Sequence, residues 1–315
     1  MGSSVQATIL VLIDTIDEFL PLLEAVGLRV VVAGNAADKA RAIHAHGADI
    51  RAVLTRGTTG FDAQDIAALP NLGIICALGA GYEGIDLNAA RARGIAVTNS
   101  PGVNAGAVAD HALALLLAVV RGIPAADASV RRGEWQRALR PGISGKRLGI
   151  LGLGAVGLAI AARAAGGFAM TVHYHARTPR PSSPYVYCPD AVALARASDF
   201  LVVATPGGAG TRHLVNADVL KALGPSGFLV NIARGSVVDT AALVDALQAG
   251  AIAGAALDVF ENEPNVPDDL KRCPNLVLTP HIAGRSPDAV RATVQHVADN
   301  LAAYFAGRPV LTPVG

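Results

Sequence analysis

The chain has 315 residues, of which 52% are hydrophobic and 16% are charged, and its formal net charge is +1. This length predicts about two domains, and the composition is typical of a soluble α/β protein whose parallel sheets are covered on both faces. The near-neutral charge argues against nucleic acid or an anionic membrane as a partner. The cysteines, Cys76, Cys188 and Cys273, are far apart, so we expect reduced thiols in a cytoplasmic protein.

The first third of the chain alternates between strand-like and helix-like runs. The apolar run Ala7–Ile13 follows no basic segment and is followed at once by Asp14, so it predicts a first core strand rather than a signal peptide. The predicted strands are Thr8–Ile13, Arg29–Ala33, Ala52–Leu54, Gly73–Ala77 and Ile95–Val97, with helices such as Ala36–His46 and Leu87–Arg93 between them. This alternation predicts a parallel α/β domain. Turn-forming residues over Asn99–Asn104 predict a hinge after it.

The longest apolar helix is predicted over Val108–Val120. It contains Asp110 and His111, and it is shorter than the roughly 20 residues that a membrane span requires. We therefore expect no membrane segment.

At mid-chain, a glycine loop links a strand-like run, Arg147–Leu151, to a helix-like run, Ala155–Ala165. The loop reads Gly152-Leu153-Gly154-Ala155-Val156-Gly157. In such a setting Gly152 permits a tight turn, Gly154 lets a pyrophosphate approach the backbone, and Gly157 lets the helix pack closely on the strand. The free N–H groups of the helix favour phosphate. The pattern predicts dinucleotide binding, with a chance match as the alternative in a chain of 34 glycines.

The next strand, Thr171–His175, ends where an NAD-binding unit would place an acid for the ribose 2′-hydroxyl. No Asp or Glu occurs between Trp135 and Pro189. Arg177, Thr178 and Arg180 instead supply donors that suit a 2′-phosphate. The sequence predicts NADP(H) as the preferred cofactor, with NAD(H) possible, and an ordinary basic turn is the alternative.

The strand and helix alternation repeats after the glycine loop. Predicted strands follow Thr171–His175 at Phe200–Ala204, Phe228–Ile232, Gly254–Val259 and Val277–Thr279, and predicted helices cover Ala217–Leu223, Ala241–Ala249 and Pro287–Phe305. Asn216 and Thr240 are the expected N-caps of the first two helices. The fold class is therefore α/β, with two doubly wound parallel-sheet domains. Periodicity leaves open which domain the last helix covers.

The ends of the last three predicted strands carry polar residues of catalytic types. Arg234, Glu263 and His281 follow them in that order. Because open parallel sheets bind ligands at the carboxyl ends of their strands, we expect the three side chains to converge. An Arg can fork onto the carboxylate and carbonyl oxygens of a 2-oxo acid, a His can donate a proton, and a Glu can orient the His. Taken singly, Arg234 could be a surface ion pair and His281 an exposed or capping residue.

In these motifs the chain resembles the D-isomer-specific 2-hydroxyacid dehydrogenase family over essentially its whole length. The motifs are Leu151–Gly157, Val230–Gly235, Leu257–Pro264 and Thr279–Gly284. The resemblance implies a flavodoxin-like substrate-binding domain over residues 1–99 and 286–315, completed by the C-terminal helix. It implies a Rossmann NADP-binding domain over residues 100–285, with the active site between the two.

The resemblance also implies roles for individual residues. Arg234 binds substrate, His281 is the acid/base, and Glu263 is its partner. The implied cofactor contacts are Val108, Gly152, Gly154, Ala155, Val156, Gly157, Arg177, Thr178, Arg180, Thr205, Pro206, Ile232, Ala233, Asp258 and Gly284. The implied substrate contacts are Arg234, His281 and the backbone amides of Leu78, Gly79 and Ala80, for which a plain Gly-rich connection is the alternative. We expect no metal ion.

Within the family, the turn at Arg177 and Thr178 resembles that of the NADPH-preferring glyoxylate, hydroxypyruvate and hydroxyphenylpyruvate reductases. Two departures stand out. Many members have Thr in place of Ala105, so one polar cofactor contact is expected to be absent or replaced. Residues Gly207–Gly210 replace bulkier polar residues, so a looser wall of the cofactor site is expected.

The predicted function is NADPH-dependent reduction of small 2-oxo acids, such as glyoxylate or hydroxypyruvate, to D-2-hydroxy acids by a cytoplasmic homodimer. By resemblance, Trp135 lies in an extension that packs on a second subunit. Its indole either reaches the neighbouring active site or is a plain core or interface aromatic. Two alternatives for the whole chain are a regulatory NAD(P)-sensing protein of the corepressor kind and a dehydrogenase for another small acid, such as phosphoglycerate or formate.

Overall fold

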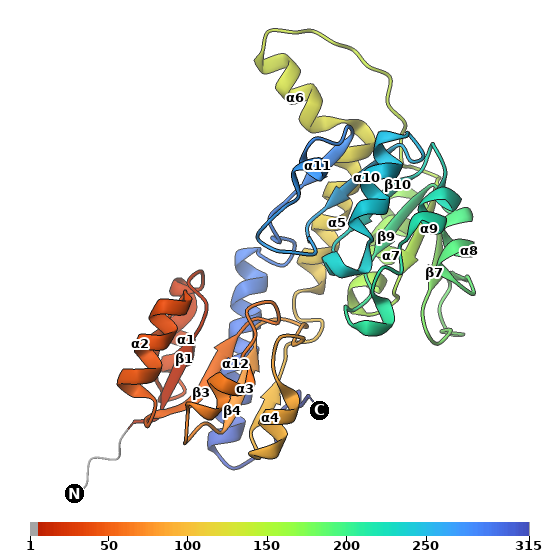
Figure 1. Ribbon diagram of the computed structural model, residues 1–315. Coiled ribbons are helices and arrows are strands. Elements are labelled where there is room, and N and C mark those ends of the chain that lie inside the picture. The colour runs from red at the N-terminus through yellow and green to blue at the C-terminus, as the bar shows by residue number, and fades with distance from the viewer. Residues whose placement is uncertain (1–5, 315) are drawn as a thin grey trace, which may run out of the picture. The chain divides into compact units, whose positions relative to one another are not determined.

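The computed structural model describes residues 6–314, which form two compact units, each built on one parallel sheet (Figure 1). One unit combines the residues up to Asn104 with those from Ser286 onward, and the other is Ala105–Arg285. The short stretch Ser100–Asn104, placed with the second domain in the sequence analysis, belongs to the first unit. The Ser100 N–H donates to the Gly79 carbonyl at 2.7 Å, which holds this stretch to the first sheet.

The sheet of the first unit has the strand order β2-β1-β3-β4-β5, and all its pairs are parallel. The strands are β1 (Thr8–Val11), β2 (Arg29–Val32), β3 (Ile50–Thr55), β4 (Ile74–Ala77) and β5 (Ala96–Thr98). This is the flavodoxin-like order, so the predicted fold of this unit is confirmed. The strand bounds differ from the predicted ones by at most two residues at either end.

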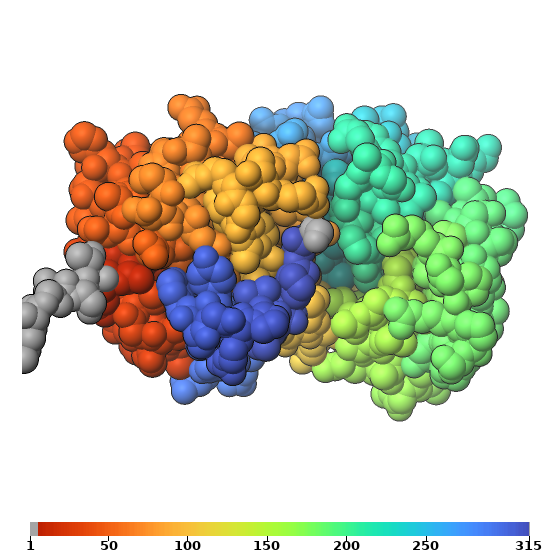
Figure 2. All heavy atoms as spheres, turned by 90° about the horizontal axis from the view of Figure 1, so that it is seen from below, coloured from red at the N-terminus to blue at the C-terminus, as the bar shows by residue number. Residues whose placement is uncertain are grey.

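Alternating side chains of these strands face two apolar layers. Ile9 and Val11 pack with η1 and α1 (Asp17–Phe19 and Leu20–Glu24) and with α12 (Pro287–Phe305). Leu10 faces the other layer, which contains α2 (Ala36–His46), α3 (Ala63–Ala67) and α4 (Leu87–Ala92). Helix α12 therefore completes the first unit, and in Figure 2 the dark blue C-terminal residues lie against its red and orange residues.

The sheet of the second unit has the order β12-β11-β10-β9-β6-β7-β8, again all parallel. The strands are β6 (Arg147–Leu151), β7 (Thr171–His175), β8 (Val186–Tyr187), β9 (Phe200–Val203), β10 (Phe228–Asn231), β11 (Gly254–Leu257) and β12 (Leu276–Leu278). This is the Rossmann order with one added strand, as predicted. The sequence analysis missed β8, because two residues are too few to show a strand periodicity.

Helices cover both faces of this second sheet. One layer contains α5 (Ala105–Arg121) and α7 (Ala155–Phe168). The other contains α8 (Ala191–Arg196), α9 (Ala217–Leu223) and α10 (Thr240–Gln248), with the short elements η2 (Ala209–Thr211), η3 (Gly235–Val237) and α11 (Asp268–Lys271) nearby in the chain. Helix α6 (Ile123–Arg131) and the loop after it project away from the rest of this unit (Figure 1).

One of the two predicted N-caps is confirmed and the other is wrong. Asn216 caps α9, since its side chain accepts hydrogen bonds from the N–H groups of Asp218 and Val219. The predicted cap Thr240 was wrong by one residue, because Asp239 caps α10 by accepting from the Ala242 N–H. Both Asp and Thr are common N-caps, so sequence alone did not separate the neighbours.

In the part of the chain that the structure describes, no single helix has the length and hydropathy of a membrane span, and α5 and α6 reach them only as a pair bent by 61°.

Candidate active site

The glycine loop lies between β6 and α7, as predicted. A Cβ on Gly152 would lie 2.7 Å from the Thr205 nitrogen, and Gly152 has a φ of +103°, so this position requires glycine. A Cβ on Gly157 would lie 2.1 Å from the Gly152 oxygen, so the close packing of α7 also requires glycine. Gly154 is the N-cap of α7, and no atom comes within 4 Å of where its Cβ would stand. The backbone here is open and fits a pyrophosphate at the helix N-terminus.

The turn after β7 lies beside the glycine loop, because β6 and β7 pair in register from Arg147 with Thr171 to Leu151 with His175. The Gly152 N–H donates to the His175 carbonyl at 2.8 Å. The phenol of Tyr174 closes the turn by accepting from the Arg180 N–H at 2.8 Å. Arg177, Thr178 and Arg180 are all exposed on it.

Arg234 lies on the turn that follows β10. The buried Asn231 side chain holds this turn, since its Oδ1 accepts from the Ala233 N–H and its Nδ2 donates to the Arg234 carbonyl, each at 3.0 Å. Gly235 packs backbone to backbone on the next loop, because a Cβ there would lie 1.9 Å from the Phe260 carbonyl carbon. Asn231 and Gly235 both belong to the motif Val230–Gly235. The sequence did not indicate that one holds the turn or that the other allows the close packing.

The glycines after β9 make room for Arg234. A Cβ on Gly207 would lie 2.8 Å from Arg234 Cγ, so the arginine stem occupies the space that a side chain at this position would take. The expectation of a looser wall at Gly207–Gly210 is therefore wrong at Gly207, where the small residue is matched by a large neighbour. Ala105, the other departure, is buried at the start of α5.

Glu263 and His281 form a close pair on the loops after β11 and β12. The Glu263 Oε2 and the His281 Nδ1 are 2.7 Å apart, and Oε1 accepts from the Phe260 N–H at 2.9 Å. Because a carboxylate only accepts, the His281 Nδ1 carries the proton and Nε2 is the ring atom left for a ligand. The His281 side chain is 38% exposed and that of Glu263 22%.

The environment keeps Glu263 ionised. Burial raises the pKa of its carboxyl. The hydrogen bond and charge of His281, the Phe260 N–H and the charge of Arg234 together lower the pKa by more than burial raises it, so it lies below its ordinary value. The charge of Arg234 thus acts on Glu263, which in turn contacts His281. A set of this kind can bind an oxyanion and transfer a proton.

Asp258 holds the backbone that carries His281. Its two carboxylate oxygens accept hydrogen bonds from the N–H groups of Ile282 and Ala283, each at 2.9 Å, and its carbonyl accepts from the His281 N–H at 2.8 Å. The Thr279 hydroxyl also donates to this carboxylate at 2.6 Å. Asp258 is fully buried. Its hydrogen bonds stabilise the loop that carries His281, which the implied contact with the nicotinamide did not indicate.

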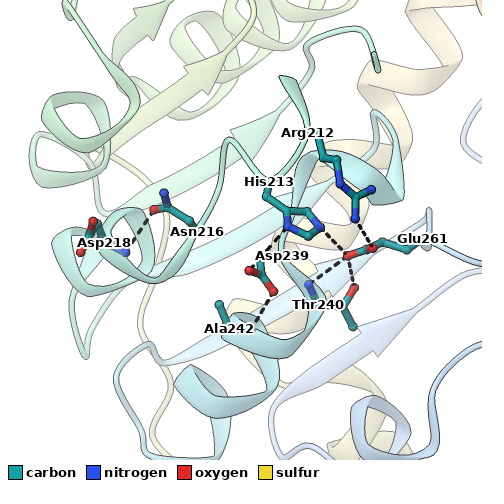
Figure 3. A network of polar contacts seen from close by, with 8 residues as sticks. All are labelled: Arg212, His213, Asn216, Asp218, Asp239, Thr240, Ala242 and Glu261. Atoms are coloured by element: carbon teal, nitrogen blue, oxygen red, sulfur yellow. Dashed lines mark hydrogen bonds and ion pairs between the residues drawn. The ribbon is translucent and has the colours of Figure 1, made fainter. Parts of the chain in front are cut away.

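A second polar network holds the loop that carries Glu263 (Figure 3). The Glu261 Oε1 accepts from the N–H and the hydroxyl of Thr240 at 3.2 and 2.9 Å and lies 3.2 Å from the His213 Nε2. Arg212 and Asp239 complete it at ion-pair distances of 3.9 Å to Glu261 and 3.6 Å to His213. Burial raises the pKa of Glu261, but these Thr240 and His213 contacts bring it below its ordinary value. Sequence reasoning missed this network, because its members come from three separate loops.

Other implied cofactor residues differ in exposure. Val108, Ile232 and Ala233 are buried, each 8% exposed. Gly284 and Thr205 are half-buried and Pro206 is exposed. The exposed side chain of Trp135, at 81%, is no part of a core within the described chain.

In the first unit, Leu78–Ala80 follows β4. The Leu78 N–H donates to the Thr55 carbonyl at 2.7 Å, so this amide is already paired within the unit. Gly79 has a φ of +113°, and the carbonyl groups of Gly79 and Ala80 accept from Ser100 N–H and Asn99 Nδ2. The amides that remain as candidates for a carboxylate are those after Leu78.

Comparison with known proteins assigns the chain to a family. The model of the D-isomer specific 2-hydroxyacid dehydrogenase NAD-binding domain matches residues 113–283. A glyoxylate/hydroxypyruvate reductase A of Arabidopsis thaliana is 44% identical over 280 residues, which cover 88% of this chain and 89% of that protein. A 2-ketogluconate reductase of Gluconobacter oxydans is 44% identical over 268 residues, covering 84% and 86%.

Among solved structures, an NADPH-dependent glyoxylate/hydroxypyruvate reductase of Sinorhizobium meliloti in complex with NADP and malonate matches with a TM-score of 0.89 and 42% identity, over 98% of this chain and 97% of that one. The chain belongs to the D-isomer-specific 2-hydroxyacid dehydrogenase family. It is an NAD(P)-dependent oxidoreductase, and its relatives support the glyoxylate and hydroxypyruvate reductase branch.

Proposed function

We propose that this protein reduces small 2-oxo acids, such as glyoxylate or hydroxypyruvate, to D-2-hydroxy acids with NADPH. The observation that carries the proposal is the 2.7 Å pair of His281 and Glu263, with Arg234 close enough to lower the pKa of that Glu. These residues follow strands β10, β11 and β12. The glycine loop follows β6, which belongs to the same sheet. Relatives named for glyoxylate and hydroxypyruvate reduction support the substrate class.

His281 is the proton donor in this proposal. Glu263 holds the proton on Nδ1, so the protonated ring presents its second proton on Nε2 to the oxo oxygen of the substrate. Glu263 stays ionised, because its pKa lies below the ordinary value, and so keeps accepting this hydrogen bond. A reduced nicotinamide held at the glycine loop would supply the hydride for the carbonyl carbon, while His281 gives the proton to the carbonyl oxygen.

Arg234 is suited to bind the substrate carboxylate. The planar guanidinium of Arg234 suits two oxygens at once, and Gly207 leaves space for its stem. In the first unit, the backbone amides that follow Leu78 are also suited to a carboxylate, as uncharged donors. Asp258 keeps the His281 loop in place through hydrogen bonds to the Ile282 and Ala283 amides.

The turn after β7 supports NADPH as the preferred cofactor. Arg177 and Arg180 are exposed on a turn that lies next to the glycine loop, where β6 pairs with β7. The two arginines of this turn, and the absence of Asp and Glu between Trp135 and Pro189, favour a 2′-phosphate over a free ribose hydroxyl. The relative from Sinorhizobium meliloti, an NADPH-dependent reductase in complex with NADP, supports the same preference.

We also propose that the protein is a homodimer that packs through α6 and the loop after it. Ile123, Val130, Trp135 and Leu139 expose large apolar side chains along this segment, and Leu139 is 100% exposed. Exposed apolar patches of this kind commonly mark an interface. The interface alternative for Trp135 is the one that its exposure supports.

A steady-state panel tests the activity. Purified protein is assayed with glyoxylate, hydroxypyruvate, pyruvate and phenylpyruvate, each with NADPH and with NADH. We expect turnover of at least one acid and a higher kcat/KM with NADPH. His281→Ala is expected to lower kcat by about 10²- to 10⁴-fold, the usual contribution of acid/base catalysis, while NADPH still binds. Near-normal turnover in this variant, or none in the wild type, would contradict the proposal.

A further inference from the structure

We propose that the C-terminal segment at Leu311 and Thr312 sets the orientation of the substrate-carboxylate loop through Asn99. The inference rests on the proposed function of the loop after β4. It makes Asn99, Asn300 and Thr312 positioning residues for substrate binding, although all three lie outside the motifs that identify the family. Their contacts form one continuous polar chain inside the first unit.

The last link of this chain fixes two peptide groups of the loop. The Ser100 N–H donates to the Gly79 carbonyl at 2.7 Å, and the Asn99 Nδ2 donates to the Ala80 carbonyl at 2.8 Å. In a trans peptide the C=O and the following N–H point in opposite directions. Holding these two carbonyls therefore turns the N–H groups of Ala80 and Gly81 away from Asn99, as neighbouring donors for one anion.

Thr312 holds Asn99 in turn. Its hydroxyl and the Asn99 carbonyl are 2.5 Å apart, and the Asn99 N–H donates to the Thr312 carbonyl at 3.3 Å. A carbonyl only accepts, so the single hydroxyl proton of Thr312 goes to Asn99. The backbone of Asn99 is thus held on both sides by one residue of the C-terminal segment.

Asn300 and His296, both on α12, hold Thr312. The Asn300 side chain is buried, with the residue 1% exposed, and its Oδ1 accepts from the N–H groups of Leu311 and Thr312 at 2.9 and 3.2 Å. Its Nδ2 donates to the Thr312 hydroxyl at 3.3 Å, and the His296 Nε2 lies 3.2 Å from the same oxygen. Since Thr312 has given its proton to Asn99, His296 must donate through Nε2.

This convergence exceeds what is needed to cover the edge of the sheet. The segment already pairs with β5 through the Val314 N–H, which donates to the Val97 carbonyl at 2.8 Å, and through a bridge between Thr98 and Pro313. The side chains of Asn300 and His296 also contact the Thr312 hydroxyl, which donates to the Asn99 carbonyl. Removing that hydroxyl leaves the Asn99 carbonyl without its donor and two donors without their acceptor.

The test compares Thr312→Val, which keeps the shape and removes the hydroxyl, with Thr312→Ser, which keeps the hydroxyl. Thr293→Val is the matched control, because Thr293 is another buried threonine of this unit whose hydroxyl donates to the Ala289 carbonyl at 2.7 Å and takes no part in the chain. We expect Thr312→Val to raise KM for the 2-oxo acid about fivefold, as for loss of one hydrogen bond, with kcat and the Kd of NADPH within about twofold of wild type.

Hydrogen exchange gives a second readout that needs no turnover. We expect the amides of Ala80 and Gly81 to exchange about fivefold faster in Thr312→Val than in wild type, and Thr312→Ser and Thr293→Val to match wild type in both measurements. Equal KM and exchange in Thr312→Val and wild type, or equal changes in Thr312→Val and Thr293→Val, would overturn the inference. A wild type that reduces no 2-oxo acid would overturn the proposed function instead, and the exchange result would still decide whether the segment orients the loop.

Discussion

At the scale of single residues, the backbone of His281 shows how the site is held. Its φ is +54°, a left-handed conformation that typically costs about 1–3 kcal/mol for a residue with a side chain. Asp258 offsets this cost by accepting hydrogen bonds from three successive N–H groups, those of His281, Ile282 and Ala283. The ring is therefore aimed by a buried carboxylate that does not itself contact it.

The charge of Glu263 should control the pH profile of reduction. Its pKa lies below the ordinary value, so the carboxylate is present at neutral pH and is lost only as the pH falls through that lowered pKa. Glu263→Gln keeps the shape of the side chain but removes the carboxylate charge that His281 Nδ1 contacts. We expect kcat/KM to fall by about tenfold or more at neutral pH, as for loss of a charge-assisted hydrogen bond, and this loss to shrink only where acid protonates the wild-type carboxylate as well.

Rate profiles from pH 5 to 9 measure this change. Glu261→Gln is the control, because Glu261 lies in the same loop but contacts His213 and Thr240. A Glu263→Gln variant with the kcat/KM of wild type at neutral pH would contradict the charge argument.

Arg177 and Arg180 should discriminate between the two cofactors. Replacing both by Ala removes two cations from the turn after β7, and each charge-assisted hydrogen bond contributes about 1.5–3 kcal/mol. We expect KM for NADPH to rise by about tenfold or more, with KM for NADH nearly unchanged. Arg196→Ala, an exposed arginine on α8, is the control. Equal effects on both cofactors would show that these residues do not read the 2′-phosphate.

At the scale of elements, α12 packs on the N-terminal sheet although the whole second unit, Ala105–Arg285, lies between them in the chain. Its residues Val290, Val294, Val297 and Leu301 recur at helical spacing and face β1, β3 and β4 in one apolar cluster. The amphipathic pattern predicted the helix, but an apolar helix face can pack on any apolar face of a sheet. Which of the two sheets α12 covers was therefore decided by the tertiary structure.

Leu301→Ala should destabilise the first unit. Leu301 is fully buried in that cluster, and removing such a side chain typically costs about 2–5 kcal/mol. We expect a lower unfolding midpoint in a denaturant titration, and Phe305→Ala, at a residue 38% exposed on the same helix, should change it much less. A midpoint unchanged by Leu301→Ala would contradict the assignment of α12 to this core.

In the loops after the strands, some site residues were predictable from the sequence and others depend on tertiary contacts. Arg234, Glu263 and His281 were predictable, because each follows a recognisable strand and the strands of a parallel sheet end at one edge. Glu261 and His213 were not, since their contact joins loops 48 residues apart. Gly207 was misjudged for a related reason: its missing side chain is explained only by the Arg234 stem beside it.

At the scale of the whole molecule, the projecting segment after α5 should govern assembly. Leu139 is fully exposed, and burying such a side chain in an interface contributes about 1.5–3 kcal/mol, whereas burying an unpaired carboxylate is unfavourable. We expect Leu139→Asp to weaken dimerisation by at least about tenfold in sedimentation equilibrium. Val32→Asp, at an exposed apolar residue of the first unit, should leave the mass unchanged. A monomeric wild type would contradict the dimer.

The sequence by itself determined the fold class, the dinucleotide loop and the three polar residues at the strand ends. These follow from local patterns: hydrophobic periodicity, glycine spacing, and the rule that parallel strands end at one edge. Tertiary structure alone decided that Asp258 supports the His281 backbone, that Gly235 and Gly207 make room for neighbouring loops, and that Thr312 reaches Asn99. Such contacts depend on which distant backbone atoms come within hydrogen-bond distance, and no periodicity along the chain encodes that.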